Sequence, residues 1–281
     1  MTPYALAAPP PFVPDNCQNG PGDWSAVGSA SAMSAFCGIF AGFVFAGVVV
    51  VIGEKNPPGG DGHASRGLRL LLPCFFGLAA ASYLYALASG ELVCLRATTE
   101  QLFSGAILAA DAVVVIAGLA WLLPAYQRNR HGEVHFFRGL VQFAAQFSVL
   151  MLIVSSIGFD NAVLRRHASP WSDAASWVSG AALMLLVLLC WWRPVPGPPP
   201  PPPFAQDHWR DETTLNRRVS ACAWTTLLLS GLLAVASGIA VGIPYEAWTD
   251  MPHWLVYALG EAGLLIPGAV VVAAVRSLPR P

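Results

Sequence analysis

Apolar residues occur in seven long runs along the chain, and short polar segments separate the runs. Each run contains roughly the 20 apolar residues that a helix needs to cross the hydrocarbon core of a bilayer. The strands of a membrane β-barrel would instead alternate polar and apolar residues over about ten positions. The pattern therefore predicts an all-α, polytopic membrane bundle of seven transmembrane helices, at about residues 27–52, 68–88, 102–123, 136–157, 171–192, 219–243 and 254–275.

The chain divides into an N-terminal tail over residues 1–26, a transmembrane domain over residues 27–276 and a short cytoplasmic tail over residues 277–281. Residues 1–26 contain several prolines but no Lys or Arg, so we expect a disordered extracytoplasmic tail and not a secretory signal. Residues 193–214 form a Pro-rich cytoplasmic linker. Its unbroken proline run, 198–203, predicts a stiff polyproline spacer, and the alternative is a docking ligand for a proline-recognising partner.

The basic residues predict the orientation, because cytoplasmic connections of membrane proteins are enriched in Lys and Arg. An N-terminus outside the cell and a C-terminus in the cytoplasm leave only Arg96, Arg165 and Arg166 on the outer side. The inner side then holds all the others, namely Lys55, Arg66, Arg69, Arg128, Arg130, Arg138, Arg193, Arg210, Arg217, Arg218, Arg276 and Arg280. The reverse topology would place most positive charge on the wrong face.

Composition agrees with an integral membrane protein. The 281 residues are 55% hydrophobic and 11% charged, with a mean hydropathy of +0.56, whereas soluble domains carry about 25% charged residues. We therefore expect a multi-pass protein of the cell membrane, surrounded by the lipid bilayer. A net charge of −1 gives no general attraction to nucleic acid. The chain contains no zinc, haem, phosphate-loop or dinucleotide motif, so we expect no metal and no cofactor.

Two acidic residues lie inside predicted spans, where a charge is costly unless it pairs, takes up a proton or meets water. Asp111 lies close to the centre of the third run, about 14 Å below its start at ~1.5 Å per residue. Glu261 lies in the seventh run, and Tyr257 is one turn away and able to donate a hydrogen bond to it. Both acids are candidate functional groups.

The fourth run carries three polar residues at intervals of four, Arg138, Gln142 and Gln146, which share one helix face. Packing of the third and fourth helices as antiparallel neighbours would let Gln146 meet Asp111, and Glu261 would continue the polar track outward. The interpretation that the sequence favours is that these groups join helices, with each contact stabilising by about 1 kcal/mol. The alternative is an ion or proton path.

Small residues at four-residue spacing predict close helix packing, because lipid gives apolar helices no hydrophobic reason to associate. One such line passes through Gly38 and Gly42 in the first run, and another through Gly238 and Gly242 in the sixth. We expect both lines to pack within the chain. The alternative is that they bind a second copy of the chain or another membrane protein.

Two cysteines, Cys17 and Cys94, fall on the outer side in the expected orientation. An oxidising outer compartment permits a disulfide between them, while two free thiols are the alternative that the sequence favours.

The run Ser82 to Glu91, Ser-Tyr-Leu-Tyr-Ala-Leu-Ala-Ser-Gly-Glu, is followed by Cys94, Arg96 and Glu100. These residues resemble those of uncharacterised multi-pass membrane proteins of actinobacterial type. The resemblance covers the first three predicted helices, and it implies a membrane location without implying an activity.

Two functions from different classes remain. The leading hypothesis is a non-enzymatic structural or regulatory membrane component, in which intramembrane polar groups join helices. The alternative is a small transporter or proton-coupled permease that uses Asp111 and Glu261. An intramembrane enzyme ranks third, because the two acids lie on different spans and the sequence does not place them near each other.

Overall fold

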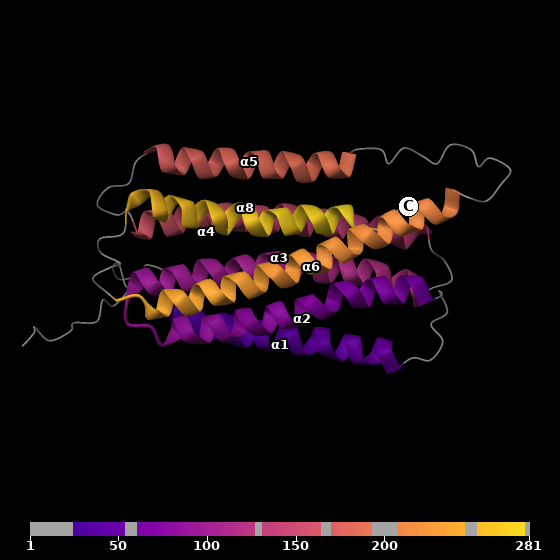
Figure 1. The fold of residues 1–281 in the computed structure, drawn as a ribbon, viewed down its shortest axis with the longest axis horizontal. Coiled ribbons are helices and arrows are strands. Elements are labelled where there is room, and N and C mark those ends of the chain that lie inside the picture. The colour runs from indigo at the N-terminus through magenta and orange to yellow at the C-terminus, as the bar shows by residue number, and fades with distance from the viewer. Residues whose placement is uncertain are drawn as a thin grey trace, which may run out of the picture.

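Long α-helices that run back and forth along one axis make up the computed structural model of this protein (Figure 1). The structure describes residues 25–53, 61–126, 131–163, 170–192, 207–244 and 252–278, and these ranges contain no strand. The all-α prediction is confirmed. The helices are α1 (Ala26–Gly53), α2 (Asp61–Ser89), α3 (Cys94–Tyr126), α4 (His131–Val163), α5 (Pro170–Trp192), α6 (Asp207–Gly242) and α8 (His253–Arg276).

Six of these helices, α1, α2, α3, α4, α6 and α8, are long and apolar enough to cross a membrane. In the fifth, α5, the apolar stretch is the shorter segment Ala174–Cys190, within a helix of 23 residues. By length and composition the chain is therefore a multi-pass helical membrane bundle.

Three helices begin well before their predicted spans, α2 at Asp61, α3 at Cys94 and α6 at Asp207. Hydropathy marks only the residues that suit the hydrocarbon layer, whereas a helix continues through polar turns beyond it. The predicted linker 193–214 is consequently helical from Asp207 onward. The N-terminal tail up to residue 24 and the proline run 198–203 lie outside the described residues.

The helix α3 is the centre of the bundle. It packs against α2, α4, α6 and α8, while α1 packs mainly on α2, and α5 lies at the opposite edge against α4 and α8 (Figure 1). Two thirds of the most apolar part of α3 (67%) is buried in the protein, against 22% for α1. Polar groups on α3 are therefore shielded by protein, whereas most of α1 is exposed to its surroundings.

Glycines bring the antiparallel helices α2 and α3 close together. A Cβ added at Gly67 would lie 2.6 Å from the Leu122 side chain and 3.2 Å from the Gly118 carbonyl oxygen. A Cβ at Gly118 would lie 2.9 Å from Leu71. These distances leave no room for a methyl group, so the two backbones approach closely only because both positions are glycine.

The glycine lines predicted on the first and sixth helices behave differently. Gly38 packs against Ser82 of α2, next to a pair of reciprocal bonds in which the Ser34 and Ser82 hydroxyls each donate to the other residue's carbonyl oxygen, at 2.8 and 2.9 Å. Added Cβ atoms at three other positions would meet nothing within 4 Å, namely Gly42, Gly238 and Gly242. A line at four-residue spacing turns gradually around a helix of 3.6 residues per turn, so it leaves the contact face.

The prediction that Gly42, Gly238 and Gly242 pack within the chain is therefore wrong. The use of these glycines by a second copy or a partner stays a prediction.

A polar cluster joins four helices near the end of the bundle where α2 begins. The buried guanidinium of Arg66 donates to Asn216 Oδ1 at 2.7 Å and to Glu212 Oε1 at 3.2 Å, both on α6. It also lies 5.1 Å from the ring centre of Trp121 on α3. The Trp121 indole in turn donates to the carbonyl oxygen of Ser277, just after α8, at 3.0 Å. Arg66 thus links α2, α3 and α6, and Trp121 extends the link to α8.

Replacement of Arg66 by Ala should lower the free energy of unfolding by about 1 to 2 kcal/mol, because it removes two hydrogen bonds and a cation–π contact. The matched control is Arg217→Ala, because Arg217 is exposed and lies on α6 close to Glu212 and Asn216. Thermal unfolding of the purified protein in detergent, followed by tryptophan fluorescence, measures both changes. Equal midpoints for the two variants would contradict a structural role of the cluster.

Candidate functional site

Asp111 lies in the middle of α3, on the face that packs against α2 and α6. Its side chain is 0% exposed. A Cβ added at Gly77 of α2 would contact Asp111 Oδ2, and it would lie 2.7 Å from the Ser230 hydroxyl of α6. The absence of a side chain at Gly77 therefore makes the space that the carboxyl group occupies.

Neither oxygen of Asp111 has a hydrogen-bond partner among the described residues. The Ser230 hydroxyl, which lies beside the same space at Gly77, donates to the carbonyl oxygen of Thr226 on its own helix at 3.0 Å. Three buried thiols, those of Cys37, Cys74 and Cys222, lie within electrostatic range of the carboxyl group. Asp111 therefore has polar neighbours but no bonded partner.

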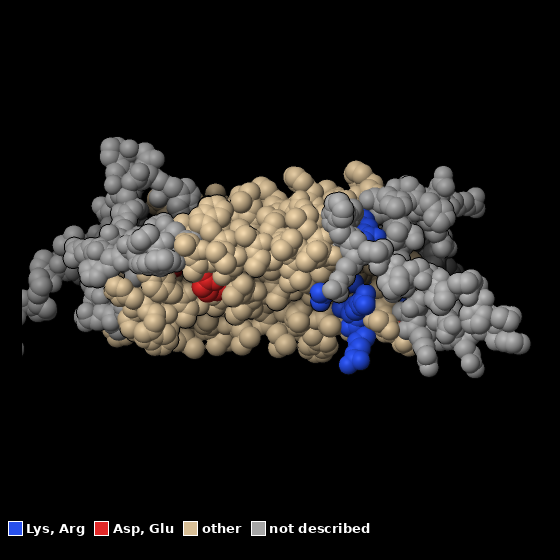
Figure 2. Space-filling view, turned by 90° about the horizontal axis from the view of Figure 1, so that it is seen from above, with Lys and Arg blue, Asp and Glu red and all other residues tan. Residues whose placement is uncertain are grey.

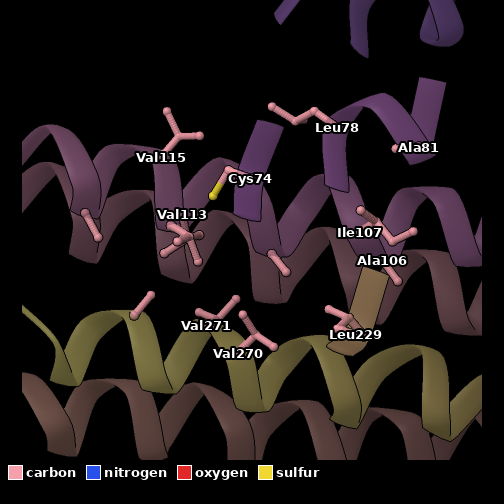
Figure 3. Close-up of a cluster of buried hydrophobic side chains, with 14 of the residues drawn as sticks. Cys74, Leu78, Ala81, Ala106, Ile107, Val113, Val115, Leu229, Val270 and Val271 are labelled. Carbon is pink, nitrogen blue, oxygen red and sulfur yellow. The ribbon is translucent and has the colours of Figure 1, made fainter. Parts of the chain in front are cut away.

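The surroundings of this face are apolar. Figure 3 shows Cys74 and Leu78 of α2, Ile107 and Val113 of α3, Leu229 of α6 and Val271 of α8 converging in one cluster. A charged carboxylate without a counter-ion costs many kcal/mol in such a medium, whereas a neutral acid or an acid paired with a cation costs much less. The arrangement suits a group that takes up and releases a proton.

Glu261 of α8 lies in a different polar cluster, between α4, α5 and α8. The buried Ser176 hydroxyl of α5 donates to Glu261 Oε1 at 3.2 Å, and the hydroxyls of Ser176 and Ser156 lie 3.4 Å apart. A Cβ added at Gly260 would lie 2.7 Å from Asp160 Oδ1 and 3.4 Å from the Ser156 hydroxyl. Hydroxyls and carboxyls here join three helices, which is the arrangement expected of polar contacts that hold helices together.

The structure does not bring the predicted track together as one path. Asp111 makes no hydrogen bond to Gln146 in the described part of the chain, and its closest polar neighbours come from α2 and α6. Gln142 is buried with its amide group unpartnered, while Gln146 is half-buried. The neighbours of Glu261 come from α4 and α5, so the two acids occupy separate contacts between helices.

The other two predicted residues, Arg138 and Tyr257, are not fully enclosed. Arg138 is half-buried near the start of α4. Tyr257 is also half-buried, and the hydroxyl that the structure shows donating to Glu261 is that of Ser176. A hydrogen bond from Tyr257 to Glu261 stays a prediction.

Sequence reasoning missed four polar residues. Glu100 on α3 is fully buried. Ser176 donates to Glu261, Ser156 lies beside Ser176, and Asp160 and Ser156 lie against Gly260. Asp160 and Ser176 fall near the ends of predicted spans, where polar residues are usually solvated. The useful signal for Glu100 was its spacing, since 11 residues are about three helical turns and place it on the same face of α3 as Asp111.

The described cysteines differ in their bonding. Cys94 is disulfide-bonded, whereas Cys37, Cys74, Cys190 and Cys222 are free. Cys17 lies outside the described residues, so the pairing of Cys17 with Cys94 stays a prediction. Within the described ranges, no group of three or more His, Cys, Asp or Glu side chains is arranged to hold a metal ion.

Replacement of Gly77 by Ala should lower the free energy of unfolding by about 1 to 3 kcal/mol, because the new methyl group overpacks the space held by Asp111. Gly42→Ala is the matched control, since a Cβ there meets nothing within 4 Å, and we expect a change within about 0.5 kcal/mol. Denaturation midpoints in detergent measure both.

Addition of Asp111→Ala to Gly77→Ala tests whether the contact is direct. It should recover part of the lost stability, because it removes the atoms that the methyl group meets. Additive effects of the two substitutions would contradict direct packing of Gly77 on Asp111.

Comparisons of this chain with protein-family models, with curated proteins and with solved structures find no match.

Proposed function

We propose that this chain is a small transporter of the cell membrane that moves protons, a proton permease in which Asp111 takes up and releases the transported proton. The observation that carries the proposal is the position of Asp111, fully buried at the contact of α2, α3 and α6 with neither oxygen hydrogen-bonded. An ionisable group in the interior of a membrane bundle is a functional candidate because its burial is costly.

The geometry favours this function over a structural role for Asp111. A polar residue that joins helices stabilises the bundle by forming a hydrogen bond across the contact. Asp111 forms no such bond with the described residues, so its burial costs free energy that no hydrogen bond offsets. A carboxyl group that alternates between the neutral and the charged form accounts for the missing partner, since a fixed partner would hold it in one form.

A specific observation supports the structural alternative for the other acid. Glu261 accepts a hydrogen bond from Ser176, and the neighbouring Ser156 hydroxyl and Asp160 carboxyl complete a cluster between three helices. A structural or regulatory membrane component would use such contacts throughout. We assign this role to the Glu261 cluster and not to Asp111.

The distribution of charge supports an orientation with the N-terminus outside and the C-terminus in the cytoplasm. Described basic residues at the starts of α2, α4 and α6 and at the end of α8 lie at one end of the bundle, and Arg96 lies toward the other. On the face drawn in Figure 2, the blue side chains gather toward the same end. Enrichment of Arg and Lys marks the cytoplasmic side.

Proton uptake into liposomes tests the proposal. The purified chain is reconstituted, a potassium diffusion potential with valinomycin makes the interior negative, and an entrapped dye reports the internal pH. We expect wild-type vesicles to acidify, and we expect Asp111→Asn to reduce the rate to that of empty liposomes, because the amide cannot carry the proton. The unfolding midpoint of this variant should not fall, since no hydrogen bond is lost.

The control variant is Glu261→Gln, which makes the same change of acid to amide in the other cluster and should keep most of the uptake. Wild-type vesicles no faster than empty ones, or an Asp111→Asn variant as fast as wild type, would contradict the proposal. Equal losses in both variants would contradict the assignment of the proton to Asp111.

A further inference from the structure

A second carboxyl group on α3 shares the features of Asp111. Glu100 is 0% exposed, and both of its oxygens are buried without a hydrogen-bond partner. Among the described residues, Glu100 and Asp111 are the two in which both carboxyl oxygens have this property. They lie on one face of the same helix, about 16 Å apart at ~1.5 Å per residue.

The end of the bundle beside Glu100 contains the groups that a proton entry site requires. Arg96 forms an ion pair with Glu91 at 3.3 Å and donates to the carbonyl oxygen of Ile243, beyond α6, at 2.9 Å. Among the described residues its Nε group is buried without a partner. Arg96 and Glu91 both lie within electrostatic range of Glu100. The guanidinium favours the Glu100 carboxylate, and the neighbouring Glu91 carboxylate disfavours it.

Hydroxyl groups extend from Glu100 toward Asp111 along this face. Ser104, one turn further along α3, is buried and donates to the Glu100 carbonyl oxygen at 2.6 Å. The buried Tyr85 hydroxyl of α2 faces Ser104 and lies against Gly105. Cys37 of α1 lies within electrostatic range of both Tyr85 and Asp111.

By their positions along α2 and α3, apolar residues lie between these hydroxyls and Asp111, namely Leu78 and Ala81 of α2 and Ala106 and Ile107 of α3. All four are at most 1% exposed, and Figure 3 shows them within the buried apolar cluster. No polar side chain in this set can pass a proton on. Transfer between the two carboxyls therefore needs the apolar layer to open and admit water.

We infer that Glu100 is the outer proton-binding residue of the permease and that the layer at Leu78 and Ile107 is the gate between it and Asp111. The inference rests on the proposed function. A hydronium ion at the Arg96 end gives its proton to a Glu100 carboxylate oxygen and leaves water. When the layer hydrates, the proton passes to an Asp111 carboxylate oxygen, Glu100 returns to the carboxylate beside Arg96, and Asp111 later releases the proton to the opposite side.

The test compares Glu100→Gln, Glu100→Asp and wild type in the liposome assay described above. Glu100→Gln should slow proton uptake by about tenfold or more, as loss of a proton-transferring group typically does. Glu100→Asp keeps a carboxyl group and should recover part of the rate. Infrared difference spectra of the wild type during a change of external pH should include two bands from buried carboxyl groups, of which Glu100→Gln removes one and Asp111→Asn the other.

The outcomes separate this inference from the proposed function. Absence of uptake by wild-type vesicles overturns the permease itself. Uptake by wild type that Glu100→Gln leaves unchanged overturns only the role of Glu100. If Glu100→Gln does not fold, the proton-uptake rate of Glu100→Asp and the wild-type infrared spectrum decide whether Glu100 binds the proton. A wild-type spectrum with a single titrating band from a buried carboxyl group overturns the inference.

Discussion

The close antiparallel contact between α2 and α3 is the constraint on which the rest of the bundle depends. Gly67 and Gly118 let the two backbones approach at one end of this contact, and Gly77 leaves the space for Asp111 in its middle. In lipid, helices associate through such close packing and through polar contacts, since hydrophobic burial gives little preference for one neighbour over another. Because α4, α6 and α8 pack on α3, the position of every inner helix follows from this pair.

Polar groups in this bundle fall into two physical kinds. The first kind has hydrogen-bond partners on other helices and holds the bundle together. It includes Arg66, Glu261 and the pair Ser34 and Ser82. Asp111 and Glu100 are equally enclosed but have no hydrogen-bond partner among the described residues, so their burial lowers the stability of the fold. Both unpartnered acids lie on α3, the helix best shielded from lipid, where a change of protonation can occur without exposing charge to hydrocarbon.

The two kinds of polar group are compatible with transport by a tight bundle. The partnered clusters lie toward the ends of the helices and between the outer helices, where they fix the scaffold. The unpartnered acids lie along one face of the central helix, with buried apolar side chains between them. A closed path of this kind needs only a local opening between α2 and α3 to connect its two proton-binding groups.

The sequence by itself determined the helical class, the approximate positions of the helices and the presence of an acid in the centre of the third span, because these depend on local hydropathy and the fixed rise of a helix. It did not determine which helices meet. The track through Gln146 assumed that chain neighbours share polar faces, but Asp111 turns toward α2 and α6. Close packing through glycines was expected on the first and sixth helices, where small residues recur every four positions. The structure instead has close glycine contacts between α2 and α3. Only tertiary packing decides these points, because the rotation of each helix about its axis depends on the shapes of all its neighbours.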